Sequence, residues 1–173
     1  IAALGPDVVV TVLDVGQGQS VAVSLPGGER LLSDAGGLFG SFDVGRAAVG
    51  AFLTDGRPPR LDLAIASHPH ADHVKGFVSL LDRFAVRGFL DNGAAPDGEL
   101  GQALAAVLAR RAVPTRSLTA GDVLDLGQGL ALETLHPGPE ADRSGNNGSL
   151  VLRLTRNGRG LALFPGDAET PVL

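Results

Sequence analysis

The chain has 173 residues, a formal net charge of −5 and 44% hydrophobic residues, which predicts one globular domain with a sizeable core. It contains no cysteine, so disulfides, thiolate metal sites and cysteine nucleophiles are excluded. No apolar run approaches the ~18 residues that span a membrane, and the acidic balance gives no overall basic surface for nucleic acid.

The first part of the chain predicts three short strands with an acidic residue near the end of two of them. Apolar and β-branched residues dominate 8–15, 20–25 and 30–34, and the turns between them contain glycine. Asp14 and Asp34 fall at or near strand ends. Each carboxylate, taken alone, is explained equally well as a turn residue and as part of a site.

Helices and strands alternate in the middle of the chain, and strands dominate its last third. The pattern predicts a helix over 44–55, a strand over 61–66, a helix from 74 to about 84, a strand over 87–90 and a helix over 99–111. Further short strands are expected at 113–118, 123–126, 130–136, 149–154 and 160–164. This order favours a layered α/β architecture with two packed sheets.

Three of the four histidines lie close together in the run HPHADH at 68–73. The run follows a predicted buried strand, so we expect it on a loop at the strand's carboxyl end, where α/β folds bind ligands. Imidazole and carboxylate groups are good ligands for divalent metals. His68 and His70 can face one ion, and Asp72 and His73 can reach a second ion about 3.5–4 Å away. The alternative is a group of ordinary surface and core histidines.

Several motifs resemble one known family. The pattern HxHxDH, followed much later by the pair Gly166-Asp167 after a predicted strand, resembles the metallo-β-lactamase superfamily. A narrower resemblance is to the metallo-β-lactamase-like domain of ComEC-type DNA-internalisation (competence) proteins. It is carried by DVGQG at 14–18, LSDAGG at 32–37, LHP at 135–137 and NNGSLV at 146–151.

The resemblance implies an α/β fold, namely an αββα sandwich with the metals at one edge between the sheets, C-terminally truncated in this chain. Residues 1–173 would form a single, incomplete domain. The chain starts at Ile1 rather than at a methionine, and we expect it to be an excerpt of a larger membrane protein. The parent protein would lie in the bacterial cell membrane, with the domain itself soluble on a side that the sequence leaves open.

The resemblance also assigns roles to individual residues. It places His68 and His70 on a first metal, Asp72 and His73 on a second, Asp167 as a bridge, and Asp34 and Asp14 behind the ligands. Asp72 would in addition orient the attacking water, which makes it the candidate catalytic residue. Asn146 and Asn147 stand where many relatives have a further histidine, and with Ser149 they are candidate substrate-binding residues or weak ligands.

The expected cofactor is one or two divalent metal ions, with manganese or zinc favoured; an amide oxygen is a harder ligand than imidazole and would favour manganese or magnesium at its position. Three features depart from the family's pattern. Gln19 stands where an acidic residue is usual, Lys75 stands where a small one is usual, and the family's later histidine has no candidate in this chain.

The implied activity is hydrolysis of DNA phosphodiesters by metal-activated water. DNA is then the expected partner, together with the membrane-channel portion of the same polypeptide and without a nucleotide cofactor. The negative net charge does not exclude a nuclease, because bound cations supply positive charge where the phosphate lies. Two alternatives stay open: another hydrolase of this fold acting on small phosphodiesters or esters, and a non-catalytic scaffold domain that contacts DNA.

Overall fold

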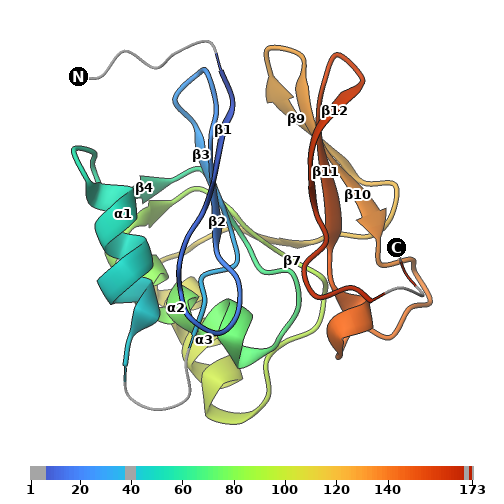
Figure 1. Ribbon diagram of the computed structural model, residues 1–173. Coiled ribbons are helices and arrows are strands. Elements are labelled where there is room, and N and C mark those ends of the chain that lie inside the picture. Colours follow the sequence, from blue (N-terminus) through green and yellow to red (C-terminus); the bar gives the residue numbers. More distant parts are fainter. Residues whose placement is uncertain (1–6, 38–41, 170–171, 173) are drawn as a thin grey trace.

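The computed structural model describes residues 7–37, 42–169 and 172. Most strands belong to a six-stranded sheet and a four-stranded sheet that pack face to face, and the longer helices cover the outer side of the larger sheet (Figure 1). A separate two-stranded parallel ladder joins β4 (Arg60–Leu61) to β6 (Ala85–Val86). The described part therefore has three layers: helices, larger sheet and smaller sheet.

The larger sheet is mixed, with the order β1-β2-β3-β5-β7-β8. Its strands are β1 (Val9–Val12), β2 (Val21–Ser24), β3 (Arg30–Ser33), β5 (Leu63–Ile65), β7 (Phe89–Asp91) and β8 (Thr115–Ser117). The first three strands are antiparallel hairpin partners, and β3, β5, β7 and β8 run parallel. The carboxyl ends of the parallel strands therefore meet at one edge, where the histidine run follows β5.

The smaller sheet is antiparallel, with the order β12-β11-β10-β9. Its strands are β9 (Val123–Gly127), β10 (Leu130–His136), β11 (Val151–Arg156) and β12 (Arg159–Phe164). The last two strands are joined by the turn Asn157-Gly158, in which both residues have positive φ, as a tight two-residue hairpin requires.

The helical elements lie mostly between strands of the larger sheet. They are η1 (Gly45–Gly50, a π-helix), α1 (Ala51–Thr54), α2 (Ala71–Arg83), α3 (Gly98–Arg110) and η2 (Asn146–Gly148, a 3₁₀ turn). Gly45 lets η1 approach α2 closely, because a Cβ on it would lie 2.2 Å from the carbonyl oxygen of Gly76. No helix in the described ranges is long and apolar enough to cross a membrane.

The core has two parts because the inner strands of the larger sheet are buried on both faces. In β3, Leu32 packs towards the helices while Leu31 packs towards the smaller sheet. Phe89 and Leu90 of β7 divide in the same way, as the two-residue period of a strand requires. Phe77 of α2 stacks edge to face on Phe89, with ring centroids 5.4 Å apart, and ties the helix to the sheet.

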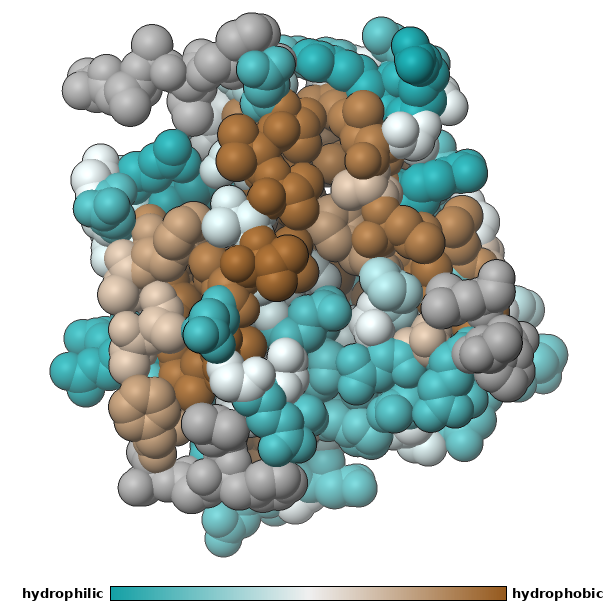
Figure 2. All heavy atoms as spheres, in the orientation of Figure 1, coloured by the Kyte–Doolittle hydropathy of each residue, from teal (hydrophilic) through white to brown (hydrophobic). Residues whose placement is uncertain are grey.

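Apolar side chains remain exposed at the edges and outer face of the sandwich. Val9 and Val12 of edge strand β1 are 54% and 76% exposed, and Leu161 and Leu163 of edge strand β12 are 49% and 53% exposed. Figure 2 shows apolar groups gathered where these two strands lie in Figure 1. The second helical layer of the expected αββα sandwich is not found among the residues that the structure describes.

Several element boundaries differ from the sequence prediction; the first strand, for example, is expected over 8–15 and found at Val9–Val12. Two of the differences lie close to the histidine run. The expected strand over 61–66 is divided at Asp62, whose carboxylate turns to accept a hydrogen bond from the backbone N–H of Arg30. The helix expected from residue 74 begins at Ala71, so Asp72 and His73 lie in its first turn rather than on the loop. An acidic residue in the first turn is favourable beside the exposed N–H groups of a helix, which helps to explain the earlier start.

Candidate metal centre

A fully buried carboxylate, that of Asp34, lies at the centre of the site. Asp34 follows β3 in the left-handed conformation, with φ 58°, and its backbone N–H donates to the carbonyl of Ile65 on β5. Its Oδ1 accepts the backbone N–H of Ser67 at 2.7 Å, and its Oδ2 accepts the Ser67 hydroxyl at 2.8 Å. The strand pairing of β3 with β5 thus brings this carboxylate under the start of the histidine run.

Asp34 fixes the orientation of two histidine rings. His73 Nδ1 lies 2.9 Å from Asp34 Oδ2, and His68 Nδ1 lies 3.0 Å from the Ser67 hydroxyl that itself donates to Asp34. If each Nδ1 carries the proton that this network accepts, each Nε2 presents a lone pair. Both Nε2 atoms are buried and have no hydrogen-bond partner among the described residues. Two buried nitrogen acceptors without partners suit a shared cation.

Asp167 completes the group from the other sheet. One ligand atom each from His68, His73 and Asp167 can be chosen so that all lie within 4.8 Å of one another. Asp167 Oδ2 is 3.2 Å from His73 Nε2, close to the ~3.3 Å that separates two ligands on one tetrahedral zinc ion at about 2 Å. These three side chains therefore fit one divalent metal ion.

The loop that carries Asp167 is held from within the sandwich. The backbone N–H of Asp167 donates to the buried Ser149 hydroxyl at 3.1 Å. The preceding Gly166 has φ +56°, and a Cβ there would lie within about 3.0 Å of both Ser149 and Ser67. The N–H of Leu150 also donates to the carbonyl of Ser67 at 2.8 Å. The segment after η2 thus joins the histidine loop to the Asp167 loop.

The two rings differ in their affinity for a proton. Burial, helped by the neighbouring His73, lowers the pKa of His68 to about 4, so that this ring is neutral at pH 7. Burial also opposes a charge on His73, but its hydrogen bond to Asp34 and the charges of Asp34 and Asp167 outweigh that effect and raise the pKa of His73. A metal ion would compete with a proton mainly at His73.

The other two members of the histidine run lie at the same place but are more open. His70 is exposed, with its ring centroid 4.5 Å from that of His68. Asp72 is half-buried in the first turn of α2, and its charge contributes to the shift at His73. A second ion between them, and the pairing of His68 with His70 on the first, stay predictions.

The remaining predicted site residues have partners inside the protein. Asn147 Oδ1 accepts the N–H of Glu169, and its carbonyl accepts from His136 Nε2 at 2.8 Å. Asn146 is half-buried in η2, and its carbonyl accepts the N–H of Ser149. These contacts shape the loop beside Asp167, and a role in substrate binding stays a prediction. The carboxylate of Asp14 is exposed and accepts the N–H of Gly16, as a turn residue does.

Three residues that support the site were not recognised from the sequence. Ser67 connects His68 to Asp34, and Gln19 donates to the same Asp34 oxygen at 3.2 Å. Gly18 packs against the start of α2, where a Cβ would lie 1.8 Å from the carbonyl oxygen of Asp72. The signal for Gly18 was present in the DVGQG motif; Ser67 and Gln19 acquire their roles only when β2, β3 and β5 are adjacent.

Residues 13–169 match the family model described as the metallo-beta-lactamase superfamily. The chain belongs to that superfamily. The metallo-β-lactamase-like α/β fold expected from the motifs is thereby confirmed. A comparison with curated protein sequences gave no match.

Solved structures support the fold at low sequence identity. CmlA, a diiron β-hydroxylase from Streptomyces venezuelae, matches 92% of this chain with 20% identity and a TM-score of 0.54, over 30% of its own length. YhfI, a metallo-β-lactamase fold protein from Bacillus subtilis, matches 83% with 15% identity and a TM-score of 0.53, over 52% of its length. Igni18, a metallo hydrolase from Ignicoccus hospitalis KIN4/I, matches 91% with 13% identity and a TM-score of 0.50, over 61% of its length.

The chain thus spans between about three tenths and three fifths of the length of these relatives. The fold is one that accommodates one or two metal ions, since CmlA is a diiron protein and PqqB from Methylobacterium extorquens was solved with Zn²⁺ bound. Membership of this superfamily and the cluster of His68, His73 and Asp167 together indicate a site for a divalent metal ion.

Proposed function

We propose that the chain is a metal-dependent phosphodiesterase that hydrolyses DNA and belongs to a DNA-uptake protein. The observation that carries the metal-dependent part is the pair of buried Nε2 atoms of His68 and His73, which have no hydrogen-bond partner among the described residues and lie close to Asp167. A bound divalent ion would polarise a phosphoryl oxygen and lower the pKa of a water molecule towards neutrality. Manganese and zinc are the first metals to test.

The protein's own groups would hold and orient the reactants. Asp34 accepts the His73 Nδ1 proton, and through Ser67 that of His68, so each ring, when neutral, presents the lone pair of its Nε2 to a cation. Asp72, half-buried on the first turn of α2, is the candidate to orient the attacking water and accept its proton. His70, exposed beside His68, is the candidate to complete a second ion site.

The choice of DNA as substrate rests on the motifs. DVGQG at 14–18 and NNGSLV at 146–151 resemble those of ComEC-type domains, and the second run forms the loop next to Asp167. On this proposal the parent protein lies in a bacterial membrane and its channel portion presents DNA to the domain. Hydrolysis of a small phosphodiester or ester is the alternative within the same fold.

The deciding assay uses the protein at its full natural length with linear DNA and Mn²⁺ or Zn²⁺. We expect cleavage that is abolished in a His70→Ala, Asp72→Ala double variant and after chelation. Asp125→Ala is the control, because this exposed carboxylate lies on β9, where it accepts the N–H of Gly127, and is not a member of the cluster. Absence of cleavage above the double variant would refute the nuclease. Less than about 0.2 equivalents of metal after reconstitution would instead favour a non-catalytic scaffold.

A further inference from the structure

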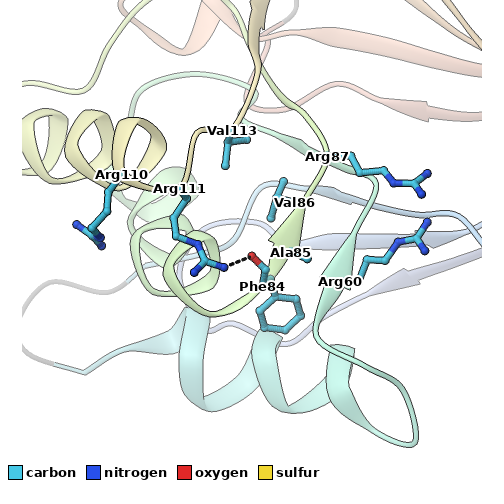
Figure 3. Close-up of a pocket in the computed structure, with 8 residues that line it drawn as sticks. All are labelled: Arg60, Phe84, Ala85, Val86, Arg87, Arg110, Arg111 and Val113. Carbon is cyan, nitrogen blue, oxygen red and sulfur yellow. Dashed lines mark hydrogen bonds between the residues drawn. The ribbon is translucent and has the colours of Figure 1, made fainter.

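A second candidate site lies at the opposite ends of the parallel strands. A cavity of about 480 Å³ is lined by four arginines, Arg60, Arg87, Arg110 and Arg111, and by an apolar floor that includes Phe84, Val86 and Val113 (Figure 3). None of the described residues that line it is acidic. Such a concentration of positive charge is unexpected on a chain with a net charge of −5.

The four guanidinium groups keep most of their hydrogen-bonding capacity. Arg60 and Arg87 share one carboxylate, that of Asp62, at 2.6 and 3.2 Å. Arg110 pairs with Asp82 at 2.8 Å, and Arg111 donates to the carbonyl of Phe84 at 3.3 Å. Two carboxylates thus form ion pairs with three of the guanidinium groups, and Glu29 adds a further negative charge near Arg60, so the four arginines still outnumber the carboxylates around them.

These arginines remain accessible to a ligand. The side chains of Arg60, Arg87 and Arg110 are 44%, 67% and 58% exposed. Each guanidinium has five N–H donors, and the ion pairs described use only one or two of them. The remaining donors can bind an anion without first breaking the protein's own contacts.

The arginines come from two sides of the cavity. Arg60 and Arg87, from the β4–β6 ladder and its exit, lie side by side with their guanidinium groups pointing outwards (Figure 3). Arg110 and Arg111, from the end of α3, lie on the other side of the apolar floor, and Arg111 reaches towards Phe84 (Figure 3). An apolar surface without charged side chains thus separates the two arginine pairs. Planar guanidinium groups of this kind match phosphate oxygens in a two-point geometry.

We propose that this arginine pocket binds the sugar-phosphate backbone of single-stranded nucleic acid. Phosphates of one strand would meet the arginine pairs at the two edges of the pocket, and a nucleoside between them would cover the apolar floor. The cavity falls within the range of about 300–1,000 Å³ typical of small-ligand sites, which admits a single unstacked nucleoside but not a duplex. Guanidinium planes also stack on nucleic-acid bases, an interaction that a carboxylate-rich peptide cannot make. This favours nucleic acid over an acidic peptide as the ligand.

The pocket is separate from the metal centre. Arg60 precedes β5 and Ser67 follows it, so the two sites are roughly 20 Å apart along the extended chain. Binding here is independent of the proposed hydrolysis and would persist if the metal centre acted on another substrate. The pocket would allow a protein with a negative net charge to bind single-stranded nucleic acid at one place on its surface.

The test measures fluorescence anisotropy of a labelled 20-nucleotide single strand with the 173-residue chain in EDTA. In an Arg87→Gln, Arg111→Gln variant we expect about tenfold weaker binding and a salt dependence reduced by about 1.4 in log–log slope, as for two lost phosphate contacts on a single strand. The ion pair between Arg60 and the buried Asp62 is retained in this variant, so we expect the protein to fold. Arg156→Gln, Arg159→Gln on the β11–β12 hairpin removes the same charge and should bind like the parent.

Four results would overturn the proposal. The first is unchanged affinity in a folded Arg87→Gln, Arg111→Gln variant, and the second is an equal loss of affinity in the hairpin control. The third and fourth are competition by polyglutamate, or by inorganic polyphosphate, that is as strong as competition by the unlabelled strand. Polyglutamate would identify a site for acidic peptides, and polyphosphate one for phosphate alone. Because EDTA is present throughout, failure here leaves the nuclease proposal unaffected, and failure of the nuclease leaves this one standing.

Discussion

The carboxylate of Asp34, fully buried, lies 2.9 Å from Nδ1 of His73 and, through the hydroxyl of Ser67, also controls His68. One residue at the end of β3 therefore orients two rings that follow β5. Because the rings are aligned before any ligand arrives, little reorganisation is needed to bind a cation there. The first two predictions follow from this contact.

Replacing Asp34 by Asn keeps its shape and tolerates the left-handed φ, but removes the charge that holds the two rings. We expect metal affinity to fall about 10- to 100-fold and stability to fall by about 1–3 kcal/mol. Metal titration and chemical unfolding measure the two effects. Asp14→Asn, at an exposed turn, is the control and should change neither. Parent-like metal affinity in Asp34→Asn would contradict the role assigned to this carboxylate.

Metal affinity should depend on pH through His73. The raised pKa of His73 means that a proton occupies the ring at mildly acidic pH, so affinity should rise as pH increases through that value and then level off. His68, whose pKa is about 4, should add no dependence above about pH 5. In Asp34→Asn the His73 pKa falls, and the midpoint should move to lower pH. An identical midpoint in both proteins, measured by metal titration across pH 5–9, would show that another group titrates.

Gly18 should be intolerant of a side chain for two separable reasons. Its φ is +93°, and a Cβ would meet the carbonyl of Asp72 at 1.8 Å. Gly121 has a similar φ of +95° with no atom within 4 Å of its hypothetical Cβ. Gly121→Ala should therefore cost about 1 kcal/mol, whereas Gly18→Ala should cost clearly more and also weaken metal binding. Equal losses in thermal unfolding would mean that the loop carrying Gly18 moves freely.

Two buried hydroxyls, those of Ser149 and Thr134, should respond to removal in opposite ways. Ser149→Ala removes the acceptor for the Asp167 N–H and should destabilise the fold by about 1 kcal/mol and lower metal affinity several-fold. The Thr134 hydroxyl is buried without a partner among the described residues, so Thr134→Val should be neutral or stabilising by up to about 1 kcal/mol, with metal binding unchanged. Unfolding curves with and without metal distinguish these outcomes.

Local features of the fold were predictable from the sequence. The hairpin of β11 and β12 follows from alternating residues on either side of Asn157-Gly158, and α3 follows from its alanine- and leucine-rich run. The helix α2 begins three residues before the position that the sequence predicts, because the histidine run resembles a loop in composition. The residue types of Asp72 and His73 do not indicate that both lie in the first turn of a helix.

The site was predictable in its residue types but not in its connections. The sequence indicated His68, His73 and Asp167, whereas Ser67 gains its role only from the pairing of β3 with β5. The arginine pocket was not predictable at all. Its lining residues come from three segments, 60, 84–87 and 110–113, which are separated by more than twenty residues along the chain and converge only because parallel strands return to the same edge.

The candidate ligands are divided between two independently hydrogen-bonded sheets. His68 and His73 follow β5 of the larger sheet, while Asp167 follows β12 at the far edge of the smaller one. A cation bound by all three would link the two sheets, in addition to the hydrogen bond between Leu150 and Ser67. Chelation would then loosen β12 first, and amide protons of that strand would exchange with solvent faster while those of β3 and β5 stayed protected.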